Sequence, residues 1–149
     1  MDAAETVRRL HLAPHPEGGF YRESFRSAQK VRLPDGRERS ASTAIYYLLP
    51  HGAWSTWHRV QADEVWHHYE GAPLQLFRLG MEPARLDRRS PQAVVPTGVW
   101  QAALPDGGAT LCGCTVAPGF EFEDFEVGTL ETLLAEYPDQ EALIRQLLR

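Results

Sequence analysis

The chain has 149 residues, and its 15 basic and 20 acidic side chains give a formal net charge of -5 at pH 7. This length fits one domain, residues 1–149, and an acidic chain without a long run of Lys or Arg argues against a nucleic-acid partner. Because no apolar run approaches the roughly 20 residues that cross a bilayer and no secretory signal pattern is present, we expect a soluble, cytoplasmic protein with no membrane partner.

The N-terminal part is predicted to contain a short helix followed by a strand. Residues 2–11 place apolar side chains among charges at helical spacing, and two prolines follow them. Residues 20–27 alternate as a strand does, and Glu23 shares one face of it with Tyr21 and Phe25. This placement indicates either a buried polar contributor to a pocket or a rim carboxylate paired with an arginine. We count Glu23 among the candidate ligand-binding residues.

Most of the remaining chain is predicted to form short strands separated by turns of Gly, Pro and Asp. The strands expected after residue 40 span residues 43–49, two strands within 54–71, 73–79, two strands within 93–103, and 110–116. Residues 80–90 are polar and are expected to form a solvated edge strand or loop. Eight or nine short strands favour an all-β fold, either a β-sandwich or a jelly-roll barrel. Cys112 and Cys114 are expected to be buried, reduced thiols.

The C-terminal end changes to a helical pattern. Residues 129–136 carry leucines at helical spacing, and Asp139 is predicted to cap a last helix with an apolar stripe. Because side chains alternate along a strand, Trp57 faces away from His58 and Trp100 faces away from Gln101. If this face is the outside of the barrel, its apolar patch is expected to meet a partner chain or the terminal helices, and we predict a homodimer.

The candidate site lies in residues 52–71, which read as two strands joined by a tight turn. Because side chains alternate along a strand, Glu64 shares one face with Trp66 and His68, and a turn at residues 61–63 brings His58 beside them. Two imidazoles and a carboxylate aimed at one space suit proton transfer, polar-ligand binding or metal coordination. Four other histidines are expected to be ordinary surface or core residues: His11, His15, His51 and His67.

This stretch resembles the first motif of the cupin superfamily, G-x5-H-x-H-x3-E-x6-G. Four positions of the motif are matched, by Gly52, His58, Glu64 and Gly71. Val60 stands where the second histidine of the motif belongs.

A second stretch, residues 96–101, resembles the second cupin motif, P-x-G-x-x-H. Gln101 replaces its histidine. In metal-binding cupins, the two histidines and the glutamate of the first motif and the histidine of the second hold the ion. The resemblance therefore implies that this chain keeps two of the four ligand positions, at His58 and Glu64.

Much of the chain is similar to one narrower family, cupin-5, a domain of unknown function. The resemblance runs from about residue 11 to residue 126 and is carried by six segments: His15-Pro-Glu-Gly-Gly-Phe-Tyr-Arg-Glu23, Thr43-Ala-Ile-Tyr-Tyr-Leu48, Trp57-His-Arg-Val60, Asp63-Glu-Val-Trp-His-His-Tyr69, Val95-Pro-Thr-Gly-Val-Trp-Gln-Ala102 and Gly113-Cys-Thr-Val-Ala-Pro-Gly-Phe-Glu-Phe122. It implies a cupin-type jelly-roll β-sandwich or barrel with short flanking helices at both termini.

The substitutions at the metal positions favour a site without a metal ion or cofactor. Valine supplies no ligand and a glutamine amide oxygen is a weak, neutral one, so metal affinity should be poor. We then expect His58 to act as a base that abstracts or delivers a proton, oriented by Glu64. His68 and Gln101 would bind the polar part of a small ligand, and Trp66 would form an apolar wall.

Three functions follow from this site. The first is a metal-independent isomerase or epimerase that acts on a small polar metabolite. The second is a non-catalytic small-molecule-binding or storage-like cupin, in which the polar cluster only orients the ligand. The third is a metal-dependent cupin enzyme, with His58, Glu64, His68 and Gln101 as the metal ligands.

Overall fold

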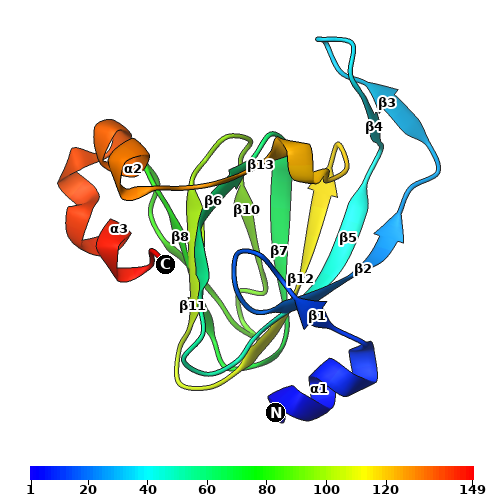
Figure 1. The fold of residues 1–149 in the computed structure, drawn as a ribbon. Coiled ribbons are helices and arrows are strands. Elements are labelled where there is room, and N and C mark those ends of the chain that lie inside the picture. The colour runs from blue at the N-terminus through cyan, green and yellow to red at the C-terminus, as the bar shows by residue number, and fades with distance from the viewer.

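Two antiparallel sheets pack face to face in the computed structural model, which describes all 149 residues (Figure 1). The larger sheet has six strands in the order β1 (Ala13–Pro14), β2 (Phe20–Arg26), β5 (Thr43–Leu49), β12 (Thr110–Ala117), β7 (Asp63–Gly71) and β10 (Gln92–Val95). The smaller sheet has five strands in the order β13 (Phe125–Val127), β6 (Ser55–Val60), β11 (Gln101–Pro105), β8 (Leu74–Arg78) and β9 (Ala84–Leu86). A separate hairpin of β3 (Lys30–Arg32) and β4 (Glu38–Ser40) projects from the sandwich.

The main core fills the space between the two sheets. It combines inward-facing side chains of the larger sheet, such as Tyr47 and Trp66, with Leu74 and Leu76 of the smaller one, all at most 1% exposed. Both cysteines are buried in this core as free thiols, as the sequence predicts. The strand alternation that buries one face of each sheet also fixes which polar side chains point inward.

A second core lies on the outer face of the smaller sheet, under the C-terminal helices α2 (Leu130–Glu136) and α3 (Glu141–Gln146). Trp57 and Trp100 are at most 1% exposed there, and they pack with Leu133, Ile144 and Leu147. The sequence left open whether a partner chain or the terminal helices cover this apolar patch, and the structure shows the helices. The patch therefore gives no support for a homodimer, which stays a prediction.

The N-terminal helix α1 (Ala3–Leu10) covers part of the outer face of the larger sheet. The side chain of Asp2 accepts a hydrogen bond from the backbone N–H of Glu5 and so caps the helix. Apolar side chains of α1 pack against Leu48 and Leu111. The chain is therefore an all-β sandwich with short flanking helices, and this part of the sequence-based expectation is confirmed.

Some local expectations are corrected by the structure. Residues 80–90 do contain an edge strand, β9, but its Leu86 is fully buried. Asp139 does not cap the last helix, because Pro138 starts a 3-10 turn, η2 (Pro138–Gln140), and α3 begins only after it. None of the helices combines the length and the apolar character that a membrane crossing requires.

Candidate functional site

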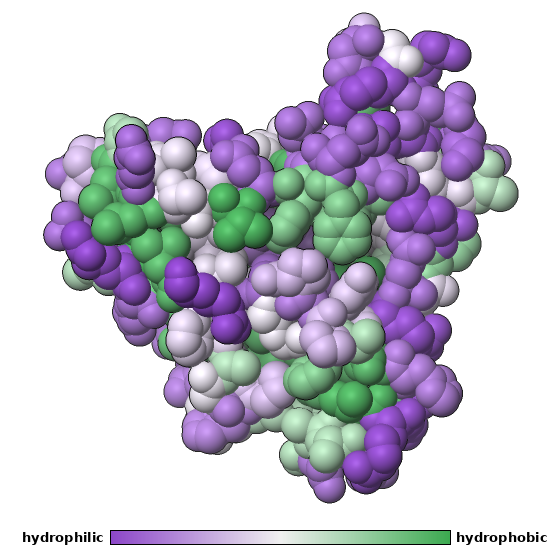
Figure 2. All heavy atoms as spheres, viewed as in Figure 1, coloured by the Kyte–Doolittle hydropathy of each residue, from purple (hydrophilic) through white to green (hydrophobic).

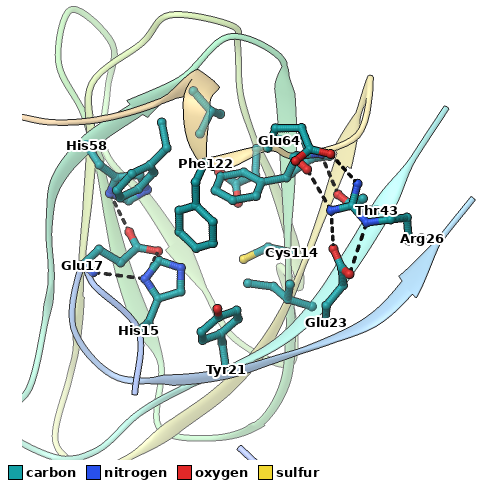
Figure 3. Close-up of a pocket in the computed structure, with 16 residues that line it drawn as sticks. His15, Glu17, Tyr21, Glu23, Arg26, Thr43, His58, Glu64, Cys114 and Phe122 are labelled. Atoms are coloured by element: carbon teal, nitrogen blue, oxygen red, sulfur yellow. Dashed lines mark hydrogen bonds and ion pairs between the residues drawn. The ribbon is translucent and has the colours of Figure 1, made fainter. Parts of the chain in front are cut away.

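A cavity of about 200 Å³ lies within the sandwich, and the 3-10 turn η1 (Phe122–Asp124) with its neighbouring residues forms part of its wall (Figure 3). Its lining combines ionisable and aromatic side chains: His15, Glu17, Tyr21, Glu23, Arg26, Thr43, Ile45, His58, Val60, Glu64, Cys114, Val116, Phe120, Glu121, Phe122 and Phe125. Three of the six candidate residues from the sequence line it, namely His58, Glu64 and Glu23.

An ion pair between His58 and Glu17 lies on one wall of the cavity. The Nδ1 atom of His58 lies 2.6 Å from Oε2 of Glu17 and 2.8 Å from the carbonyl oxygen of Thr56. Ser55 donates a further hydrogen bond of 2.6 Å to the same carboxylate oxygen. Because the Thr56 carbonyl can only accept, Nδ1 of His58 must carry a proton.

This pairing keeps His58 positively charged at neutral pH. Burial alone would lower the pKa of His58, but the charge and hydrogen bond of Glu17 and the charge of Glu64 outweigh it, and the pKa rises to about 9. For Glu17, burial acts to raise the pKa, and the charge and hydrogen bond of His58 reverse this to a net lowering. The Nε2 atom of His58 has no hydrogen-bond partner in the protein, so it is free to act on a bound molecule.

The turn before β2 places Glu17 at the ion pair. Gly19 has a φ of +73°, and a Cβ atom at this position would lie 2.6 Å from the carbonyl oxygen of Leu48. Only glycine fits this close approach, and it lets the chain turn so that Glu17 points back into the sandwich. The sequence patterns indicated no role for the carboxylate next to this turn.

His15 also reaches the cavity, although the sequence indicated only an ordinary surface or core histidine. Its Nδ1 accepts a hydrogen bond of 3.0 Å from the backbone N–H of Glu17. The 3.5 Å separation between Nδ1 and the Glu17 carboxylate is therefore not an ion pair, because Nδ1 carries no proton. Burial lowers the pKa of His15, which agrees with a neutral ring. Its ring packs edge-on against Tyr21 at 4.5 Å.

Glu64 is held by a chain of two hydrogen bonds that starts at Trp66. The indole N–H of Trp66 donates to Oε1 of Gln101 at 2.8 Å, and Nε2 of Gln101 donates to Oε1 of Glu64, also at 2.8 Å. Burial raises the pKa of Glu64. Trp66 and Gln101 do not line the cavity, so the structure places them behind Glu64 as supports.

A second charged cluster occupies the rim opposite His58 (Figure 3). The guanidinium of Arg26 contacts Glu23 at 2.7 Å and Glu121 at 2.8 Å, and it donates to the carbonyl oxygen of Phe120 at 2.9 Å. Of the two roles that the sequence left open for Glu23, the structure shows the rim carboxylate paired with an arginine. The side chain lines the cavity but is exposed and not buried.

His68 does not join His58 and Glu64. It lies on the same strand as Glu64, but four residues along a strand span about 13 Å, and Trp66 lies between them. The Nε2 atom of His68 instead lies 2.9 Å from the carbonyl oxygen of Ala72, beyond the end of β7. A shared strand face therefore did not bring the second imidazole to the cavity.

The donor set does not fit a metal ion. His68 is remote, Nδ1 of His58 faces Glu17, and the amide of Gln101 is engaged by Trp66 and Glu64. No group of three or more His, Cys, Asp or Glu side chains is arranged as a metal site. The geometry thus gives no support to the ligand set that the cupin resemblance suggested.

Comparison with known proteins places the chain among cupins. A family model described as Cupin superfamily (DUF985), Cupin_5, matches residues 4–128. A hypothetical protein from Leishmania major aligns at 34% identity and a TM-score of 0.90, with 99% of each chain covered. A protein from Shewanella oneidensis aligns at 37% identity and a TM-score of 0.87, with 100% of this chain and 98% of that chain covered.

More distant structures share the fold alone. A cupin-2 domain protein from Rhodospirillum rubrum aligns at 17% identity and a TM-score of 0.64, over 91% of this chain and 82% of its own. No functionally curated protein matches the sequence. Since the family model spans most of the chain and two relatives above 30% identity cover nearly all of it, the chain belongs to the Cupin_5 (DUF985) family of the cupin superfamily.

Proposed function

We propose that this protein is an isomerase or epimerase that moves a proton on a small polar metabolite inside the cavity, without using a metal ion. One observation carries the proposal. The buried pair of Glu17 and His58 leaves Nε2 of a charged imidazole unpaired in the same cavity as the carboxyl group of Glu64. Two ionisable groups with shifted pKa values in one enclosed space are typical of acid-base catalysis.

The electrostatics support different roles for the two groups. His58 is held protonated by Glu17, so it serves as the proton donor, and Glu17 rather than Glu64 orients it. The raised pKa of Glu64 makes its ionised form a stronger base than an ordinary carboxylate. Trp66 and Gln101 then keep this base in a fixed position.

A reaction through an enol uses both groups. The Glu64 carboxylate takes a proton from a carbon next to a carbonyl group, while Nε2–H of His58 donates its proton to the carbonyl oxygen. If the carbon that lost its proton carries a hydroxyl group, Glu64 returns the proton to the former carbonyl carbon while His58 takes back a proton from that hydroxyl group, which gives an isomer and restores both side chains. For an epimer, water protonates the first carbon from the opposite face, His58 recovers its proton from the enol oxygen, and Glu64 releases its proton to the solvent.

Exchange of carbon-bound hydrogen with solvent tests this proposal. The protein is incubated in D2O with a panel of small carbonyl compounds that carry an acidic C–H, and incorporated deuterium is followed by mass spectrometry. We expect one compound class to gain deuterium, at a rate that treatment with a chelator leaves unchanged. A protein that only binds its ligand would show no exchange, and loss of exchange on chelation would indicate a metal-dependent enzyme.

Three variants show whether the exchange depends on this site. His58→Gln and Glu64→Gln should each slow it by about 10²- to 10⁴-fold, because each removes one of the two groups that transfer protons. Glu126→Gln is the matched control, since Glu126 of β13 pairs with Arg59 of β6 and does not line the cavity. Wild-type exchange rates in both His58→Gln and Glu64→Gln would contradict the proposal.

A further inference from the structure

The cavity carries more negative than positive groups. Its two cationic side chains, Arg26 and His58, face four carboxyl groups: Glu17, Glu23, Glu64 and Glu121. His15 is neutral, because its Nδ1 accepts a backbone hydrogen bond. With Glu17 balancing His58, the other three carboxyl groups share the single charge of Arg26. The whole chain has a net charge of -5, so its overall field also favours the approach of a cation.

No cationic side chain at the rim is free to hold an anionic group. Arg26 is engaged by Glu23, by Glu121 and by the backbone. The other two arginines near η1 are held by Asp124, at 2.7 Å from Arg37 and 2.8 Å from Arg39. A phosphate or carboxylate at the rim would therefore have to displace a protein carboxylate from Arg26.

Aromatic rings complete the same wall. Phe120, Phe122 and Phe125 lie with their centroids 5.0 to 6.0 Å apart, and each pair of ring planes meets at 67° to 83°. Three rings in different orientations present both edges and faces to their surroundings. Phe122 is 49% exposed. Figure 2 shows an apolar surface near the position of η1 and β13, bordered by hydrophilic residues. The face of an aromatic ring attracts cations.

We propose that the cavity accepts a small organic cation, an amine or a quaternary ammonium compound, with its positive charge between the rim carboxylates and the phenylalanine rings. This inference rests on the proposed function, for which it names the substrate class. It depends on the rim formed by Glu23, Glu121 and Phe122, whereas proton transfer depends on His58 and Glu64. The two proposals can therefore fail separately.

Three molecules of similar shape but different charge test the inference. Choline is the cationic probe, 3,3-dimethylbutan-1-ol is its neutral counterpart, and 3,3-dimethylbutanoate is the anionic one. Titration calorimetry on the whole protein at pH 7 should give a Kd for choline about 3- to 30-fold lower than for the alcohol, the range that a cation-π contact supplies. The anion should bind more weakly than either.

Variants at the rim test where the selectivity arises. Glu121→Gln removes a rim carboxylate and should weaken the binding of choline several-fold while leaving the binding of the alcohol unchanged. Phe122→Leu should also reduce the preference for choline, because it removes a ring but keeps an apolar side chain. Glu126→Gln is the matched control, since it removes the same charge outside the cavity.

The inference is overturned by equal affinity for choline and the alcohol, by preference for the anion, or by no detectable binding at a choline concentration of about 10 mM. His58→Gln separates it from the proposed function. That variant should lose deuterium exchange and still prefer choline to the alcohol. Exchange on a neutral substrate with no preference for choline would leave the proton-transfer proposal standing and remove this one.

Discussion

The protonation state of His58 depends on one carboxylate from a distant part of the chain. Glu17 reaches it from the turn before β2, and both side chains are almost fully buried, at 5% exposure for Glu17 and 3% for His58. In a setting of low polarity an unpaired imidazolium would lose its proton. Glu17 therefore decides whether the group facing the cavity is an acid or a neutral imidazole.

Replacement of Glu17 by Gln should reverse the pKa shift of His58. Without the carboxylate, burial dominates, and we expect the pKa of His58 to fall from about 9 to below the ordinary value of 6.5. The measurement is an NMR titration of the imidazole carbon and nitrogen signals. Ser55→Ala is the control, because it removes a hydrogen bond to Glu17 but keeps the ion pair. A pKa that stays near 9 in Glu17→Gln would exclude Glu17 as the cause.

The same pair should make the stability of the protein depend on pH. The pKa of His58 is raised on folding, so its contribution to stability is complete below about pH 6.5 and is lost as the pH rises through about 9. We expect the urea midpoint of the wild-type protein to fall across this window. The fall should be smaller in Glu17→Gln, and identical curves for the two proteins would contradict this account.

At the scale of elements, two segments from the C-terminal part of the chain shape the site from outside the sheets. The segment of η1 forms part of the cavity wall and is held by Asp124, which pairs with Arg39 of β4 at 2.8 Å. Helices α2 and α3 cover the outer face of β6, the strand that carries His58. The indole N–H of Trp57 donates to the carbonyl oxygen of Ile144 at 3.0 Å, which ties α3 to this strand.

Truncation of Ile144 tests how much the docking of α3 stabilises the fold. Its side chain is fully buried against the two tryptophans, so Ile144→Ala should cost about 2 to 5 kcal/mol of unfolding free energy. Urea denaturation followed by tryptophan fluorescence measures this loss. Glu141→Ala, on the exposed side of the same helix, should change stability by less than about 0.5 kcal/mol. Equal effects of the two variants would mean that the helix contributes little through burial.

At the scale of the whole molecule, the larger sheet keeps some apolar side chains on its outer face. Tyr69 of β7 is 53% exposed, and Val94 of β10, which pairs with Val65 of β7, is 46% exposed. Since the C-terminal helices cover the patch around Trp57 and Trp100, this is the surface on which we expect a homodimer to form.

We expect the wild-type protein to be a dimer by light scattering at micromolar concentration. Tyr69→Glu combined with Val94→Glu should give a monomer, because two carboxylates would then be buried in the interface. The control is Met81→Glu, an exposed position in the connection between β8 and β9 of the smaller sheet. A wild-type monomer would reject the dimer, and a double variant that stays dimeric would place the interface elsewhere.

Sequence patterns predicted the sandwich and the inward direction of His58 and Glu64, because both depend on strand alternation. Alternation does not report distance along a strand, so it grouped His68 with Glu64 although Trp66 separates them. Glu17 was missed because its partner is set by the turn and by packing between segments far apart in the sequence. The available signal in the sequence was the pair of glycines that follows Glu17, because such a pair indicates an unusual backbone path. The structure shows the close approach that requires one of them, Gly19.

The two buried thiols allow motion around the cavity to be measured without any substitution. Cys112 and Cys114 are the only cysteines in the chain, and Cys114 lines the cavity beside Glu64. Burial raises the pKa of both thiols, so neither reacts readily with an alkylating reagent while the wall is closed. The rate at which a small maleimide labels the native protein therefore reports how often the wall opens, and a ligand that fills the space should slow that labelling.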